Sequence, residues 1–204
     1  MARAARLPLI LLVLALAACG GSGTDTSKPP ASRCRISGSD STFPLLDAKR
    51  PHTIDVLTNL GAFSIRLDVE DSPCVASSFA SLVRRKFFDG TVFHRIVPHF
   101  VIQGGDPSGT GTGGPGYTVV EPPPSNSLYT EGVVAMAKAA SEPSGAAGSQ
   151  FFVVTASNAG LPPEYAILGV VTKGLKIVER IGRLGDPATE KPTRRVVVLR
   201  MTLV

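Results

Sequence analysis

The chain has 204 residues, of which 43% are hydrophobic and 18% are charged, and its formal net charge is +5. These values suit one globular domain with appendages and exclude a long disordered chain. We expect Arg3 and Arg6 to be removed with a leader; without them the 21 basic residues fall to 19 against 16 acidic ones, a balance of +3. So mild a charge, with no dense basic run, gives no indication of nucleic-acid binding.

The first 18 residues have the pattern of an export signal. Arg3 and Arg6 precede an apolar stretch, LPLILLVLALAA (7–18), that is too short to span a bilayer comfortably. The stretch ends in Leu16, Ala17 and Ala18, which supply small residues directly before Cys19, so the segment resembles the signal of a bacterial lipoprotein. The resemblance implies cleavage before Cys19, lipidation of its thiol, and a place on the extracytoplasmic face of the cell membrane. A plain secretory signal or an uncleaved anchor is the alternative.

The segment after Cys19 predicts a tether. Residues 20–32, GGSGTDTSKPPAS, have almost no apolar content, so we assign 19–50 to the lipidated cysteine and a flexible tether and 51–204 to the domain. Outside the cytoplasm, Cys34 and Cys74 can pair and close a loop of roughly forty residues; two free thiols are the alternative. The sequence has no Cys/His cluster with zinc spacing, so it predicts no metal site.

Apolar periodicity predicts the elements from Thr53 onward. Residues 53–58 (TIDVLT) and 62–69 (AFSIRLDV) predict a hairpin, since the second segment alternates apolar and polar side chains. Ser72 followed by Pro73 predicts the start of a helix that continues to about Phe87. Short apolar runs separated by glycine and proline then predict strands at 92–97, 100–103, 132–137, 149–155 and 165–171. A second helix at 174–183 and a last strand at 195–204 complete a mainly β domain, which we interpret as a small barrel of about eight strands capped by two helices.

One glycine-rich segment has a formal match to a cofactor motif. GTGGPG (111–116) fits the glycine spacing of dinucleotide-binding loops, but Pro115 interrupts it and the strand-like run from Tyr117 to Val120 follows where a helix is needed. The three histidines lack a serine or cysteine partner motif. The sequence therefore predicts no cofactor and no nucleophilic triad.

Three ordered motifs carry a specific resemblance. They are FHRIVPHFVIQGGDPSGTGTGG (93–114), GVVAMAKA (132–139) and GSQFFVVTA (148–156). Together they resemble the signature of the cyclophilins, the peptidyl-prolyl cis/trans isomerases, over residues from about 53 to 204. The resemblance implies a closed eight-stranded antiparallel barrel with a helix at each end and a proline-binding groove on its outer face. It also implies a monomeric enzyme without a cofactor that acts on proline-containing peptide segments, here those of extracytoplasmic proteins.

The family's functional residues carry over by position within the motifs. Arg95 matches the catalytic arginine, and Gln103 matches the glutamine that bonds the substrate backbone. The residues that match the apolar pocket for the proline ring are Phe100, Met136, Phe152 and Leu161. The residues that match the strand flanking the peptide, and its neighbourhood, are Ala137, Lys138, Ala139, Gln150 and Tyr165.

Three positions depart from many eukaryotic members of the family. Gly160 replaces a tryptophan, which removes one wall of the groove and should weaken binding of the drug cyclosporin. Tyr165 replaces a histidine, and Lys138 replaces an asparagine whose backbone makes much of the peptide contact. Gly160 and Lys138 keep a second hypothesis open, in which the domain is a proline-peptide binding or chaperone module with little turnover.

Overall fold

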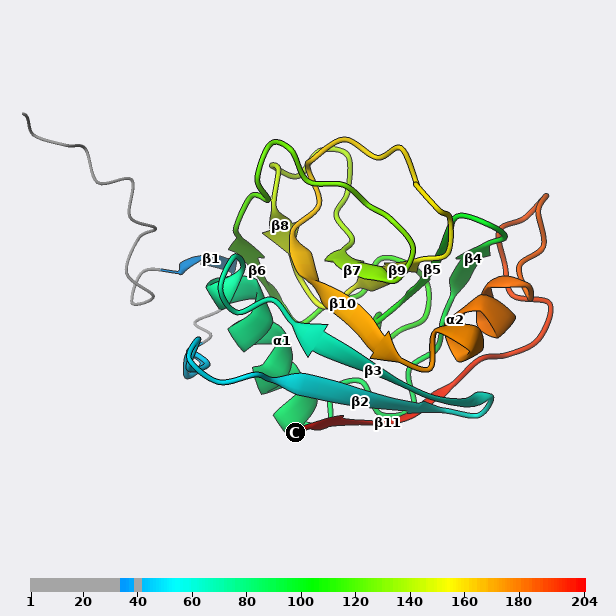
Figure 1. The fold of residues 1–204 in the computed structure, drawn as a ribbon, viewed down its shortest axis with the longest axis horizontal. Helices are drawn as coiled ribbons and strands as arrows, with labels where there is room; N and C mark the ends of the chain where they lie inside the picture. The colour runs from blue at the N-terminus through cyan, green and yellow to red at the C-terminus, as the bar shows by residue number, and fades with distance from the viewer. Residues whose placement is uncertain (1–33, 39–41) are drawn as a thin grey trace, which may run out of the picture.

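The computed structural model describes residues 34–38 and 42–204 (Figure 1). Its strands are β1 Arg35–Gly38, β2 Thr53–Thr58, β3 Gly61–Leu67, β4 Arg95–Val97, β5 Val101–Gly104, β6 Tyr117–Val120, β7 Val133–Met136, β8 Ala146–Ala147, β9 Phe151–Val154, β10 Ile167–Lys173 and β11 Val198–Leu203. Its helices are α1 Pro73–Arg84 and α2 Leu175–Gly182. Each predicted strand overlaps one of these strands, and both predicted helices are confirmed. Within the described ranges, neither helix is long and apolar enough to cross a membrane.

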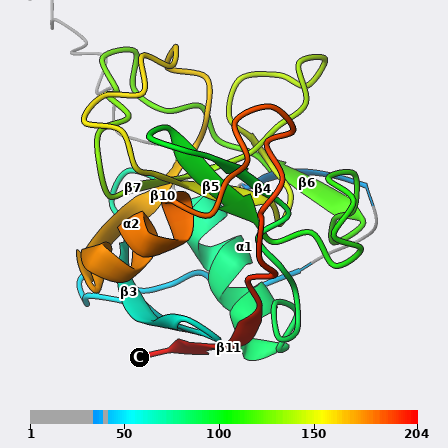
Figure 2. The same cartoon turned by 90° about the vertical axis from the view of Figure 1, so that its right-hand side faces the viewer.

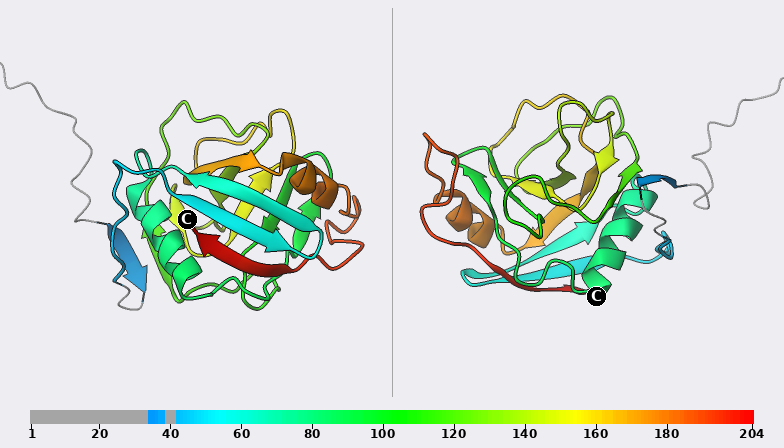
Figure 3. Two further views of the ribbon diagram at one scale, coloured as in Figure 1. Left: turned by 60° about the horizontal axis from the view of Figure 1, so that its bottom comes forward. Right: turned by 180° about the vertical axis from the view of Figure 1, so that it is seen from behind.

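Eight strands form one antiparallel sheet in the order β11-β2-β3-β10-β7-β9-β5-β4. The sheet curves into a half-barrel, with β11, β2 and β3 side by side on one wall (Figure 3). Because β2 and β3 pair from Thr53–Arg66 to Thr58–Gly61, the predicted hairpin is confirmed. The helices α1 and α2 lie near opposite ends of this hairpin (Figure 1).

The predicted closed barrel is not what the structure shows, because no ladder joins β4 to β11 among the described residues. The segments that lead into these two strands meet at an isolated bridge between Val92 and Val197, where the N–H of Phe93 donates to the carbonyl of Val196 at 3.1 Å and the N–H of Val198 to that of Thr91 at 2.9 Å. The free edge of β4 is occupied instead by the loop at 185–193, since the N–H of Ile96 donates to the carbonyl of Glu190 at 2.8 Å. Figure 2 shows this loop rising beside β4 on the way from α2 to β11.

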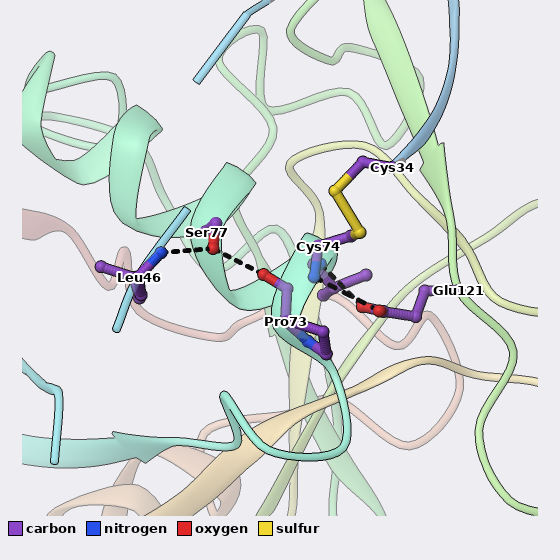
Figure 4. The surroundings of a disulfide bond; sticks show 7 residues. Cys34, Leu46, Pro73, Cys74, Ser77 and Glu121 are labelled. Atoms are coloured by element: carbon purple, nitrogen blue, oxygen red, sulfur yellow. Dashed lines mark hydrogen bonds between the residues drawn. A yellow bond between two sulfur atoms is a disulfide. The ribbon is translucent and has the colours of Figure 1, made fainter. Parts of the chain in front are cut away.

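A second sheet, in the order β1-β6-β8, includes two strands that the sequence did not predict. β1 precedes Pro51, where we placed the start of the domain, and pairs with β6 from Arg35–Val120 to Gly38–Tyr117. The predicted disulfide is confirmed: Cys34 is bonded to Cys74, and their Cα atoms are 5.5 Å apart (Figure 4). A strand and a disulfide thus lie within 19–50, the segment that we assigned to the tether, while Cys19 and the predicted spacer at 20–32 lie outside the described residues.

The start of α1 is capped by a distant carboxylate. Ser72 occupies the N-cap position but makes no side-chain capping bond. The N–H groups of Cys74 and Val75 donate to Glu121, at 3.3 and 2.9 Å, which places a negative charge at the positive end of the helix dipole (Figure 4). Glu121 directly follows β6, so this cap joins the helix to the smaller sheet.

The end of α1 falls before the predicted end near Phe87. Lys86 adopts a left-handed backbone with φ of 57°, a conformation that ends helices. The N–H of Lys86 donates to the carbonyl of Val83 at 2.9 Å, and the N–H of Phe87 to that of Leu82 at 3.0 Å. A glycine usually signals this motif in a sequence, and here a lysine takes its place.

Side chains of β7 and β9 alternate between two apolar clusters. The larger cluster is the main core, which includes α1 and takes Val134, Met136, Phe151 and Val153 from these strands. The smaller cluster lies on the other face of the strands and takes Ala135, Phe152 and Val154, together with Val101 of β5 and Tyr129. Because successive strand residues face opposite sides, one set of residues builds the core while the next set forms the floor of a surface site.

Candidate active site

A cavity of about 210 Å³ opens over the smaller cluster. It is lined by Arg95, Phe100, Val101, Gln103, Ala137, Lys138, Phe152, Leu161 and Tyr165. Eight of these residues are among those predicted from the sequence. The structure thus brings a guanidinium and an amide together with aromatic and aliphatic walls.

A wider cavity of about 620 Å³ adjoins the first and shares Gln103, Ala137 and Lys138 with it. Two predicted residues, Ala139 and Gln150, line this second cavity rather than the first. It is also lined by residues 111–116 and by Tyr117 and Thr118 at the start of β6. The two cavities are therefore neighbouring parts of one groove, joined at these three shared residues.

The prediction that Met136 lines the apolar pocket is wrong. Its side chain is 1% exposed and belongs to the main core, because the neighbouring residue Ala135 faces the other side of β7. Val101 lines the pocket and was missed. The alternation of β5 offers the signal that would have found it: Gln103 faces the groove, so Val101, two residues earlier, faces it too.

A hydrogen-bonded tyrosine fixes the aromatic wall. Tyr129, which the sequence analysis missed, is buried; its hydroxyl donates to the carbonyl of Tyr165 at 2.7 Å and accepts from the N–H of Tyr165 at 3.0 Å. Burial raises the pKa of Tyr129, so its hydroxyl stays protonated near neutral pH. The Tyr165 ring meets the Phe152 ring edge to face, with centroids 5.5 Å apart. The wall is therefore set in place before any ligand arrives.

A chain of hydrogen bonds crosses the groove from Arg95. Arg95 and Gln103 face each other as a cross-strand pair on β4 and β5, and Nη1 of Arg95 donates to Oε1 of Gln103 at 3.4 Å. Nε2 of Gln103 donates to Oε1 of Gln150 at 3.1 Å, and Nε2 of Gln150 donates to the carbonyls of Gly111 and Gly113 at 2.9 and 3.0 Å. Each amide has one orientation that satisfies both neighbours, so the chain is directional.

Glu190 also binds Arg95, from the loop that covers the edge of β4. Its Oε2 accepts from Nε of Arg95 at 2.6 Å, with the two side chains 46% and 36% exposed. An exposed ion pair of this kind contributes about 0–1 kcal/mol to stability. Glu190 has φ of 57°, and a left-handed backbone costs a residue other than glycine about 1–2 kcal/mol. The contribution of this ion pair to folding stability therefore does not exceed the cost of the left-handed backbone at Glu190.

The loop at 106–113 is organised by a buried carboxylate. Asp106 has no exposed surface; its Oδ1 accepts from the N–H and hydroxyl of Ser108, each at 2.7 Å, and its Oδ2 from the N–H groups of Gly111 and Gly113 at 2.6 and 3.1 Å. Burial by itself would raise the pKa of Asp106, but these donors outweigh it and hold the pKa far below its usual range. The same glycines hold Gln150 through their carbonyls, so Asp106 supports the groove from behind.

The geometry suits binding and orientation of a peptide better than covalent chemistry. The groove offers a fixed cation, two amides and an apolar pocket, with no serine–histidine or cysteine–histidine pair among the residues that line it. Within residues 34–38 and 42–204, no group of three or more histidine, cysteine, aspartate or glutamate side chains is placed to hold a metal ion.

Residues 53–203 match the model of one protein family, described as cyclophilin type peptidyl-prolyl cis-trans isomerase/CLD. The chain belongs to this cyclophilin family. It is 32% identical to a peptidyl-prolyl cis-trans isomerase of Arabidopsis thaliana over 76% of this chain and 94% of the relative. It is 34% identical to peptidyl-prolyl cis-trans isomerase-like 1 of Mus musculus over 76% of this chain and 93% of the relative.

Solved cyclophilins share the fold. A cyclophilin type isomerase of Cryptosporidium parvum superposes with a TM-score of 0.68 at 27% identity, covering 76% of this chain and 98% of that one. A structure of the same protein in the presence of the dipeptide Ala-Pro superposes with a TM-score of 0.67 at 28% identity, covering 74% and 98%. The present protein is thus an enzyme, a peptidyl-prolyl cis-trans isomerase of the cyclophilin type.

Two departures from other cyclophilins have clear structural settings. Gly160 has φ of 63°, a side chain at this position would meet nothing within 4 Å, and the residue is not among those that line either cavity. Lys138 is buried, with 5% of its side chain exposed; it pairs with Glu164 at 3.4 Å and its Nζ lies 5.7 Å from the centre of the Tyr165 ring. Of these two residues, Lys138 lies in the wall of both cavities.

Proposed function

We propose that this cyclophilin accelerates X-Pro rotation through Arg95, with the proline ring held among Phe100, Val101, Phe152 and Leu161. One observation carries the proposal: the guanidinium and these apolar side chains line the same cavity. Nη2 of Arg95 has no hydrogen-bond partner among the described residues, so it can donate to a bound peptide. Gln103 beside it would bond the substrate backbone, and residues 137–139 would flank the peptide.

The physical basis is a difference between the planar amide and the twisted one. Rotation about an X-Pro bond faces a barrier of about 18–20 kcal/mol because the nitrogen lone pair is delocalised into the carbonyl. Twisting localises that lone pair, and a guanidinium aimed at the nitrogen can bond it then and only weakly before. The bond favours the transition state over the ground state, as catalysis requires. A charge-assisted hydrogen bond is worth about 1.5–3 kcal/mol, or roughly ten- to a hundred-and-fifty-fold in rate.

The test is the substitution Arg95→Ala in the full chain. We expect the rate of cis/trans exchange of a proline tetrapeptide to fall at least about tenfold, with little change in the thermal midpoint because Arg95 is partly exposed. Arg66→Ala is the matched control, since Arg66 is an exposed arginine on β3, outside both cavities. Exchange as fast in Arg95→Ala as in the parent protein would refute the role of Arg95.

A binding module with little turnover is the second candidate function, and the setting of Lys138 favours it. Its buried ammonium is held by Glu164 and by the carbonyls of Ala139 and Glu142, at 3.4 and 3.2 Å, which stiffens one side of the groove. The same peptide separates the two functions when its affinity and its exchange rate on the protein are both measured. Tight binding without faster exchange would favour the binding module.

The substrates we propose are proline-containing segments of extracytoplasmic proteins, met at a membrane to which the enzyme is attached through a lipid on Cys19. The export pattern before Cys19 supports this location. The disulfide between Cys34 and Cys74 supports it as well, because disulfides persist in oxidising compartments. Uncatalysed X-Pro isomerisation takes tens to hundreds of seconds and can limit folding there. The enzyme would act as a monomer that assists this step.

A further inference from the structure

The loop at 185–193 is built as a rigid support for Glu190. The N–H of Glu190 donates to the carbonyl of Asp186 at 2.8 Å, and the N–H of Asp186 donates to the carbonyl of Lys191 at 2.9 Å. The Asp186 side chain accepts from the N–H groups of Ala188 and Thr189, both at 2.9 Å. These bonds close the loop on itself, so the position of residue 190 is fixed by its own backbone.

The same loop is seated on β4 next to Arg95. The carbonyl of Glu190 accepts from the N–H of Ile96 at 2.8 Å. Gly185 passes so close to the carbonyl of Ile96 that the position has no room for a side chain. Because Ile96 follows Arg95 directly, two contacts on one strand residue set the distance between the Glu190 carboxylate and the guanidinium.

We propose that Glu190 is a positioning residue that aims the guanidinium of Arg95 into the groove. The inference rests on the catalytic role proposed for Arg95. A partly exposed arginine has several rotatable bonds and would otherwise sample solvent. Glu190 fixes Nε and Gln103 fixes Nη1, and two fixed nitrogens define the plane of the group. The freedom lost on reaching the reactive geometry is then removed before the peptide binds.

The contact pattern distinguishes positioning from inhibition. A carboxylate that blocked Arg95 would take the Nη edge, which carries four of the five N–H donors. Oε2 of Glu190 instead accepts from Nε, and no residue that the structure describes takes the two donors of Nη2. Solvent around both side chains screens the carboxylate, so Arg95 keeps most of its attraction for a developing lone pair. The left-handed backbone of residue 190 is the local cost of this arrangement.

The experiment compares Glu190→Gly and Glu190→Gln in the full chain. Glycine tolerates the left-handed backbone and removes only the side chain, so the loop stays folded. Glutamine keeps an oxygen that accepts from Nε without a charge. We expect Glu190→Gly to slow exchange of the bound proline peptide about fivefold to tenfold while peptide affinity stays within about twofold. Glu190→Gln should stay within about twofold of the parent rate.

Each variant is also made in the Arg95→Ala background, where removal of Glu190 should have no further effect on the rate. An unchanged or faster rate in Glu190→Gly, with Arg95→Ala still impaired, would overturn the positioning role alone. An equal loss in both backgrounds would overturn it too, because Glu190 would then act through the loop. Full activity of Arg95→Ala by itself would overturn the proposed role of Arg95, and the two failures are thereby distinguished.

Discussion

At the scale of single residues, His94 and Asp106 both have a pKa below the ordinary value, but for different physical reasons. Both ring nitrogens of His94 are buried without a hydrogen-bond partner among the described residues. Burial lowers the pKa of His94 below its ordinary value of 6.5, an effect that Arg95 reinforces and Asp106 opposes. The folded protein therefore holds this imidazole neutral, while the unfolded chain protonates it near pH 6.5.

The sign of the resulting pH dependence follows from proton uptake. Below about pH 6.5 the unfolded state binds a proton that the folded state does not, so stability falls as pH decreases toward the lowered pKa of His94. The loss is at most about 1.4 kcal/mol for each pH unit in that window. We expect His94→Phe, which keeps a planar ring without a titrating nitrogen, to flatten the thermal midpoint between pH 7 and pH 5.5.

Asp106 provides the internal control in this experiment. Its pKa is far below the ordinary value of 3.8, so its contribution is complete above about pH 4 and is lost only in stronger acid. Parent and His94→Phe proteins should therefore lose stability in parallel below pH 4. A midpoint that declines equally in both proteins between pH 7 and pH 5.5 would show that His94 is not the group responsible.

The location of the candidate site could be predicted from motif positions. The side of the strand to which each side chain points could not. Four predicted residues that line the smaller cavity lie in the first and third motifs, namely Arg95, Phe100, Gln103 and Phe152. Met136 was assigned to the pocket from a motif alone. Side chains alternate between the two faces of β7, and the Met136 side chain lies on the face that packs in the main core. Glu190 could not be found, since it meets Arg95 across a separation of 95 residues and belongs to no motif.

At the scale of elements, a disulfide adds a covalent tie to a short strand, β1, that also pairs with β6. β1 has four residues, none of them buried, and within the part of the chain that the structure describes it pairs only with β6. So short and exposed a strand gains little from packing. The bond between Cys34 and Cys74 holds its start against α1, where Glu121 also caps the helix (Figure 4).

We expect the double substitution Cys34→Ser and Cys74→Ser to lower the free energy of unfolding by about 3–4 kcal/mol, the loop-entropy estimate for a closed loop of roughly forty residues. Denaturant unfolding measures the difference, and reduction of the parent protein should reproduce it. The isomerase rate under native conditions should stay unchanged, because neither cysteine lines the groove. Equal stability of the parent and the double variant would show that β1 is held by its strand pairing instead.

Elements with strong periodicity were the predictable ones. The hairpin of β2 and β3, both helices and the strands of the main sheet follow from apolar spacing. β1 and β8 were not predicted because their side chains show no apolar pattern of useful length. Both strands pair with β6, and β1 directly follows the disulfide-bonded Cys34. The absence of a ladder between β4 and β11 in the described structure was not predicted, because a loop rather than a strand covers the edge of β4.

At the scale of the whole molecule, attachment to a membrane is the proposal that decides where the enzyme works. We expect the full chain expressed in bacteria to partition with detergent, and Cys19→Ser to move it to the aqueous phase, since only a lipidated thiol supplies the acyl chains. Cys34→Ser is the matched control and should leave partitioning unchanged. A parent chain found in the aqueous phase would contradict the lipid anchor.

The disulfide also sets the path of mechanical load. Any pull on the chain ahead of Cys34 passes through sulfur into Cys74 and the first turn of α1. The hairpin of β2 and β3 lies between the two cysteines in sequence and is bypassed, so tension does not peel it from the sheet. Shear at a cell surface would therefore reach the main core through a helix, while the strands around the groove remain unloaded.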